Sequence, residues 1–209
     1  LAPLQGRVAY LGFRTVPLSI PAWVGMGPWQ EHPVQFGCRV AQANGDVEHS
    51  DWLADGRVDS RAVMAQALLE TLDGVDVVVA YDKAAQKRCL EAIASAVPEQ
   101  TRELMAISSK TMDLLPAVRD NVYHPDFLGS FELTSVLPAL VPSFGYEPLE
   151  VSEGQSVEAL LHRLLFSTPG PHSTELEALR QKLQSDCAQY TLALVRLKER
   201  LDELAEGRA

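Results

Sequence analysis

The sequence has few cysteines and no paired cysteine motif. Cys38, Cys89 and Cys187 lie far apart in the 209 residues, and none belongs to a Cys-x-x-Cys pattern. This spacing excludes a disulfide framework and a close-spaced zinc site. It favours buried thiols in a reducing compartment, which we expect to be the cytoplasm. The five histidines are equally dispersed, so no structural metal held by Cys or His is expected.

Basic charge is also scarce, and long apolar runs are absent. Eighteen Lys and Arg residues stand against 28 Asp and Glu residues, which gives a formal net charge of −10. Because nucleic-acid binding depends on cations that neutralise phosphates, we expect weak binding of nucleic acid or none. No apolar run approaches the roughly 18 residues of a membrane span, so no membrane segment is expected. The sequence begins at Leu1, without a start methionine and without a basic leader. We therefore expect a piece excised from a longer protein.

Apolar patterns predict an α/β domain whose sheet starts with a hairpin. Short apolar or alternating stretches predict strands near residues 7–13, 34–40, 47–53, 75–81 and 112–115. Asn44-Gly45-Asp46 supplies the turn between the second and third strands. Helical patterns predict helices near residues 59–72, 83–95, 116–121 and 132–140, with another that Pro98 opens. In the first of these, Val63, Ala67, Leu68 and Leu72 share one face. This order predicts a mixed five-stranded sheet flanked by helices.

The chain is expected to form one domain over residues 1–209. Its core covers about residues 6–166, a linker about 167–172, and a long C-terminal helix about 174–206. Leucines of that helix follow a heptad seam. We expect Leu183–Leu197 to dock on the chain's own sheet, and Leu201 and Leu204 to project and support a weak homodimer. The alternative is that these two leucines also belong to the chain's own core.

Two strings of residues identify a family. They are Pro28–Phe36, and Tyr123–Phe131 followed by Val136–Pro142. Both resemble the bacterial family called domain of unknown function 2779, over roughly Val8–Val157 and again over Cys187–Leu197. The resemblance implies an RNase H-like, DnaQ-type exonuclease-like fold of the DEDD class. It also implies that members often follow a RecB- or Cas4-like nuclease domain in one polypeptide.

The resemblance further implies four acids around two magnesium ions, and this sequence departs from that pattern. The matching positions hold Gly12 and Arg14 in the first strand, Gln86 in the second motif and Tyr190 in the third. Magnesium prefers several oxygen ligands, and Arg14 would place a fixed cation where the metal should lie. We therefore expect no cofactor and no catalytic residue at these positions.

Other acids provide an alternative. Asp82, Asp113, Asp126 and Asp186 would be the relocated carboxylates of an active, magnesium-dependent 3′–5′ exonuclease. The simpler interpretation is that Asp82 caps the following helix, Asp113 and Asp126 make turn hydrogen bonds, and Asp186 is solvated. His124 is either a general base or a loop histidine that holds backbone carbonyls, and we favour the second role.

Arg14 needs a partner if it is buried. We expect a carboxylate, with Asp82 first and Glu132 second. The alternative is an anion site that Arg14 forms with Arg39 and Lys83.

Two tryptophans in the loop between the first strands also have two interpretations. Trp23 and Trp29 either stack on bases or form a small core of their own loop, and we favour the loop core.

The sequence as a whole predicts a catalytically silent exonuclease-like module. It would act by binding, with a protein partner or an adjoining nuclease domain. A dimerising scaffold with no ligand in the cleft is a third hypothesis.

Overall fold

Fifteen helical and strand elements make up the described part of the chain in the computed structural model. The structure describes residues 4–42, 47–145, 156–166 and 173–208. The strands are β1 (Val8–Pro17), β2 (Glu31–Ala41), β3 (Val47–Leu53), β4 (Val77–Ala80) and β5 (Thr111–Asp113). The α-helices are α1 (Arg61–Thr71), α2 (Lys83–Ala94), α3 (Thr101–Ser109), α4 (Leu114–Asn121), α5 (Leu133–Leu140), α6 (Val157–Phe166) and α7 (Ser173–Ala205). Three short 3₁₀ helices are η1 (Pro98–Gln100), η2 (Pro125–Phe127) and η3 (Pro142–Phe144).

The strands form one mixed, five-stranded sheet in the order β3-β2-β1-β4-β5. The central strand β1 pairs antiparallel with β2 and parallel with β4, and β5 extends the sheet parallel to β4. The predicted α/β class and the predicted order of strands and helices are therefore confirmed. The predicted turn at residues 44–46 and the predicted linker at 167–172 lie outside the described residues.

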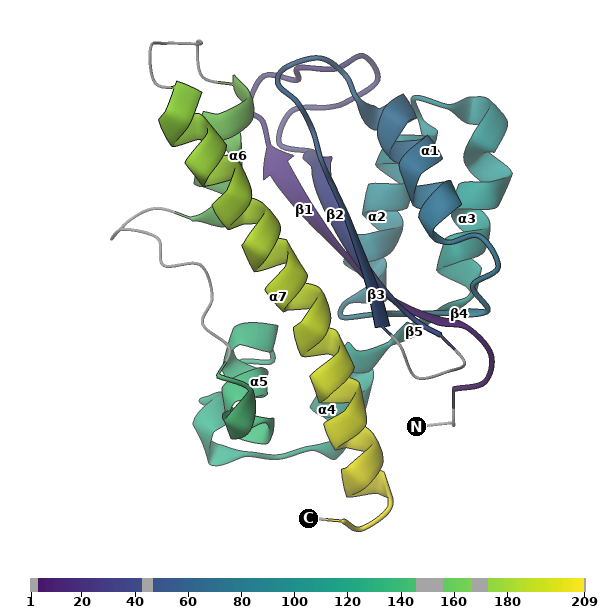
Figure 1. The fold of residues 1–209 in the computed structure, drawn as a ribbon, viewed down its shortest axis with the longest axis vertical. Coiled ribbons are helices and arrows are strands. Elements are labelled where there is room, and N and C mark those ends of the chain that lie inside the picture. Colours follow the sequence, from purple (N-terminus) through teal and green to yellow (C-terminus); the bar gives the residue numbers. More distant parts are fainter. Residues whose placement is uncertain (1–3, 43–46, 146–155, 167–172, 209) are drawn as a thin grey trace.

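Helices cover both faces of the sheet (Figure 1). Helices α1, α2 and α3 lie against one face, where alternate residues of β1 such as Ala9 and Leu11 are fully buried. The other face carries α4, α5 and the long diagonal helix α7, which bury Val8 and Tyr10. Because side chains alternate along a strand, Gly12 and Arg14 lie on the same face as Val8 and Tyr10, under α7.

Two glycines let α7 approach the sheet closely. Gly12 and Gly37 are direct neighbours in the β1–β2 register. A Cβ atom on Gly12 would lie 2.4 Å from Cε1 of Tyr190, and one on Gly37 would lie 2.7 Å from Sγ of Cys187. Both contacts are shorter than side chains tolerate, so the absence of two side chains creates the groove in which α7 lies.

Two predicted apolar faces are wrong in part. On α1, Leu68 is buried as predicted, but Val63 is 60% exposed and Arg61 is buried in its place. On α7, Leu201 does not project, because it is buried in the same cluster as Leu194. This helix therefore docks on its own domain over at least one more turn than predicted. The homodimer stays a prediction.

Candidate functional site

The four positions where the family resemblance places acids come together beside one end of the sheet. Gly12 and Arg14 come from β1, Gln86 from α2 and Tyr190 from α7. A cavity of about 680 Å³ lies over Arg14 and Tyr190, between the sheet, α7 and the start of α5. A smaller cavity of about 140 Å³ lies beside it and is lined by Gly12, Gln86 and Tyr190. The positions that the resemblance implies are therefore neighbours in the structure.

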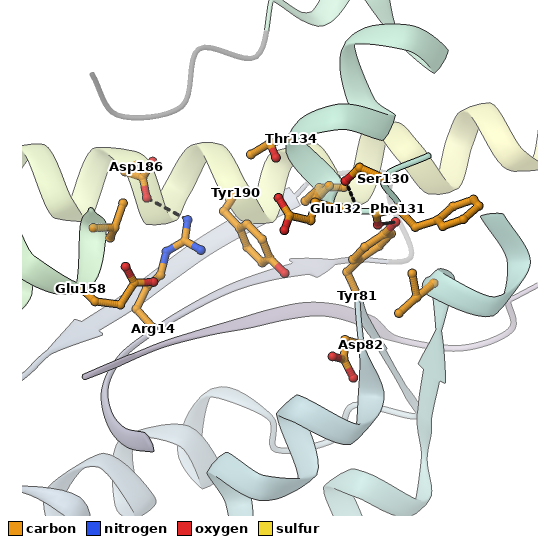
Figure 2. A pocket seen from close by; sticks show the side chains of 13 residues that line it. Arg14, Tyr81, Asp82, Ser130, Phe131, Glu132, Thr134, Glu158, Asp186 and Tyr190 are labelled. Carbon is orange, nitrogen blue, oxygen red and sulfur yellow. Dashed lines mark hydrogen bonds and ion pairs between the residues drawn. The ribbon is translucent and has the colours of Figure 1, made fainter. Parts of the chain in front are cut away.

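Arg14 forms a buried ion pair with Asp186 (Figure 2). Its Nη2 atom donates to Oδ2 of Asp186 at 2.8 Å, and the aspartate side chain is only 3% exposed. The guanidinium also lies over the ring of Tyr190, 4.5 Å from its centroid. Desolvation disfavours the charged guanidinium, but Asp186, Cys187 and Tyr190 together outweigh it, so the pKa of Arg14 is raised.

The prediction of a carboxylate partner for Arg14 is thus right, but the predicted partner is wrong. Neither Asp82 nor Glu132 takes this role, although both line the same cavity. Asp186 is not solvated as expected. It lies one helical turn before Tyr190 on α7, so the Asp186 carboxylate and the Tyr190 ring reach Arg14 from the same face of the helix.

Tyr190 occupies the space that a side chain at position 12 would need. The ring atoms Cε1 and Cδ1 lie 2.4 and 2.6 Å from where a Cβ atom on Gly12 would be. An aspartate at position 12 and a tyrosine at position 190 are therefore mutually exclusive in this arrangement. The two departures from the DEDD pattern fit each other sterically.

Asp82 and Asp113 are engaged in holding helices. Asp82 accepts a hydrogen bond from the backbone N–H of Ala85 and caps α2, in the left-handed conformation at φ 66°. Asp113 accepts from the backbone N–H groups of Asp82, Lys83 and Leu115, so one carboxylate joins the starts of α2 and α4. The predicted capping role of Asp82 and the hydrogen-bonding role of Asp113 are confirmed.

Asp126 and His124 lie in the loop before α5, outside the two cavities. His124 Nδ1 accepts from the backbone N–H of Asp126 at 3.3 Å, so this histidine holds an amide and not the predicted carbonyl. The Asp126 side chain is 76% exposed and lies 3.7 Å from the same histidine nitrogen. Neither residue is in a position to act at the sheet end.

Magnesium does not fit this donor set. The four positions supply one amide oxygen and one phenol, next to a fixed guanidinium, whereas Mg²⁺ is held by carboxylates. Of the four acids that the alternative interpretation names as relocated carboxylates, only Asp82 and Asp186 line the large cavity, and Asp186 is paired with Arg14. Within residues 4–42, 47–145, 156–166 and 173–208, no three His, Cys, Asp or Glu side chains are grouped to hold a metal ion.

The alternative anion site is not assembled either. Lys83 donates through Nζ to the backbone carbonyl of Thr111, and Arg39 donates to the carbonyl of Ala188. Neither lines the large cavity, so Arg14 is the one cation among its described lining residues. The geometry therefore does not support the alternative in which these three cations form a phosphate site.

The two tryptophans have different roles. Trp23 is buried, but in a cluster that it shares with β1, β2 and α6, and Trp29 is 72% exposed, so the predicted core of the loop alone is wrong. Sequence reasoning missed the residue that organises this loop, Arg61. Its side chain, 1% exposed, donates to both oxygens of Asp59 and to the carbonyl of Val24, and lies over the Trp23 ring. No local pattern signals this, because an arginine at the start of a helix normally faces solvent.

Gln86 is the other residue whose environment the sequence did not reveal. It is 5% exposed, and neither its amide oxygen nor its amide nitrogen has a hydrogen-bond partner among the described residues. Buried polar groups nearly always have partners, so this amide has hydrogen-bonding capacity for a group other than the described protein atoms, such as a water molecule or a ligand.

The structure defines an α/β domain with a mixed five-stranded sheet, one end of which is enclosed by the long helix α7. Residues 9–132 match the family model described as "Domain of unknown function (DUF2779)", and the chain belongs to this family. None of the curated proteins searched matches it.

A solved structure supports the fold. The family B DNA polymerase of the hyperthermophilic archaeon Pyrobaculum calidifontis is similar, with a TM-score of 0.57 and 16% identity. The match covers 93% of this chain and 24% of the polymerase, so this chain spans about a quarter of that protein. A structure titled "ExoI/SSB-Ct complex" matches at a TM-score of 0.35 and 14% identity, over 97% of this chain and 44% of that one.

In the part of the chain that the structure describes, no helix is long and apolar enough to cross a membrane.

Proposed function

We propose that this chain is a catalytically silent exonuclease-like domain that acts by binding, within or beside a larger nuclease. The observation that carries the proposal is the Arg14–Asp186 pair at 2.8 Å, stacked on Tyr190. Arg14 stands where the resemblance places a metal-binding acid and supplies no oxygen ligand, and the ring of Tyr190 closes the space above Gly12. The family resemblance supports the association with an adjoining nuclease domain or a protein partner.

The sheet end is filled by other side chains, although the acids of the DEDD pattern are absent. Arg14 pairs with Asp186 and lies over the ring of Tyr190, and Asp82 and Asp113 hold helix starts. The sheet end is thus stable without metal, while the large cavity remains accessible from outside. This arrangement suits a module that keeps the fold of an exonuclease and uses its cleft for recognition.

The test is an incubation of the purified chain with labelled single-stranded DNA and RNA in Mg²⁺ or Mn²⁺. The expected result is that both oligonucleotides stay intact. Degradation that a chelator stops, and that Asp82→Ala or Asp186→Ala abolishes, would show an active nuclease with relocated carboxylates. Glu103→Ala, an exposed acid on α3 outside both cavities, is the matched control.

A further inference from the structure

The charged side chains that line the large cavity are mainly acidic. Four carboxylates line it, from Asp82, Glu132, Glu158 and Asp186, against the single guanidinium of Arg14. Arg14 and Asp186 neutralise each other at 2.8 Å, so three carboxylates face the cavity without a cation among its described lining residues. A phosphate-bearing ligand would be repelled here, and a cationic ligand would be attracted.

The walls of the same cavity are aromatic. Tyr81, Phe131 and Tyr190 line it, and the Tyr81 hydroxyl donates to the backbone carbonyl of Phe131 at 2.5 Å (Figure 2). This bond fixes the ring of Tyr81 at the cavity wall. Arg14 already lies 4.5 Å from the centroid of Tyr190, which shows that a guanidinium is accommodated on these rings. Aromatic faces with carboxylates around them bind ammonium and guanidinium groups.

The small cavity adds a second kind of contact. It shares Tyr81, Asp82 and Tyr190 with the large one, so the two are parts of one continuous site. Gln86 lines it and is 5% exposed, and its amide lacks both a donor and an acceptor partner among the described residues. A peptide group offers one N–H and one C=O and can satisfy such an amide on both sides, once neighbouring side chains of the cavity move and expose its buried atoms.

We propose that the two cavities form one binding site for a short basic segment of a protein partner. A lysine or arginine side chain of the partner enters the large cavity, between the aromatic rings and the carboxylates of Glu132 and Glu158. The partner's backbone bonds to the amide of Gln86. The inference rests on the proposed function, because it names the class of ligand that the silent cleft recognises. The volume of about 680 Å³ lies in the usual range of ligand pockets, about 300–1,000 Å³.

The probe is the peptide acetyl-Gly-Arg-Gly-amide, titrated into the ¹⁵N-labelled full chain and followed by NMR. Its matched control is the same peptide with citrulline, which has nearly the shape of arginine and no charge. The arginine peptide should shift the signals of Tyr81, Gln86 and Tyr190. If each of the three carboxylates raises the affinity for the charged peptide about twofold, the citrulline peptide binds about tenfold more weakly than the arginine peptide.

Substitutions separate recognition from folding. Gln86→Met keeps the volume and removes the unpartnered amide, so it should raise or preserve the melting temperature while weakening the arginine peptide about tenfold. Glu132→Gln and Glu158→Gln should each weaken it about twofold, and Glu103→Gln on α3 should leave it unchanged.

Three results would overturn the inference. They are equal affinity for the two peptides, a Gln86→Met variant that melts earlier but binds normally, and displacement of the arginine peptide by a single-stranded oligonucleotide. None of them involves hydrolysis. The inference can therefore fail while catalytic silence holds, and metal-dependent degradation of oligonucleotides would refute the proposed function on its own.

Discussion

The contact between Gly12 and Tyr190 predicts that Gly12→Ala destabilises the protein when the Tyr190 ring is present and stabilises it when the ring is absent. In Gly12→Ala the new Cβ atom would lie 2.4 Å from Cε1 of Tyr190, so the ring must move away from its place beside Arg14. Overpacking of this kind costs about 1–3 kcal/mol. Alanine in place of glycine in a strand gains about 0.5–1 kcal/mol from the unfolded chain. The clash dominates, and Gly12→Ala should lower the free energy of unfolding by about 1–2 kcal/mol.

Removal of the ring reverses this expectation. In a Tyr190→Ala background no ring is present to clash, so Gly12→Ala should raise the free energy of unfolding by about 0.5–1 kcal/mol. Urea unfolding of the four proteins gives the coupling free energy of the double-mutant cycle, expected at about 1.5–3 kcal/mol. Gly37→Ala is the matched control, because its Cβ would meet Cys187 at 2.7 Å and should cost the same in both backgrounds. Equal effects of Gly12→Ala in the two backgrounds would refute the steric argument.

Three further predictions concern buried charges and thiols. Asp186→Asn should cost about 1–3 kcal/mol in urea unfolding, because the Arg14 guanidinium loses its carboxylate, and adding Arg14→Met should recover most of the loss. No recovery would contradict the pairing. Arg61→Met should cost about 3–5 kcal/mol, since it leaves Asp59 and the Val24 carbonyl without their donor, and a loss under about 1 kcal/mol would contradict this. Burial raises the pKa of each of the three thiols to about 12. Iodoacetamide should therefore label none at about pH 8 without denaturant. Stability should fall as the pH rises above the ordinary thiol pKa of 9.0, because the unfolded chain then loses protons that the native chain keeps. Flat stability between about pH 8 and 10.5 would argue against these raised values.

Local patterns predicted the elements well because the signals for strands and helices are local. The run of apolar residues at Val77–Ala80 identified the strand next to the sheet centre, and Asp82 identified the start of α2. The convergence of Gly12, Gln86 and Tyr190 followed from the family resemblance and not from spacing. Helix α6 (Val157–Phe166) was not predicted, although Leu161 and Leu165 are one turn apart and buried.

Contacts between distant segments could not be predicted in the same way. Arg14 and Asp186 are 172 residues apart, and nothing near Arg14 in the sequence distinguishes Asp186 from the nearer candidate Asp82. The burial of Arg61 depends on Val24 and Ala92, which belong to a loop and a helix that only the fold brings together. Packing geometry decides which group pairs with a buried arginine, and that geometry cannot be deduced from a single sequence.

The late position of α7 in the chain has a consequence for how the protein is made. During synthesis from the N-terminus, one face of β1 stays uncovered until Ser173–Ala205 has emerged. At about 5–20 residues per second, this interval after α5 lasts about 3–13 s, during which Val8 and Tyr10 are exposed to other nascent chains. The cleft itself is the last part to form, because Asp186 and Tyr190 arrive with this final helix. A ribosome-bound intermediate therefore has a sheet but not yet the cavities at its end, and the exposed face of β1 is covered at the same moment as these cavities form.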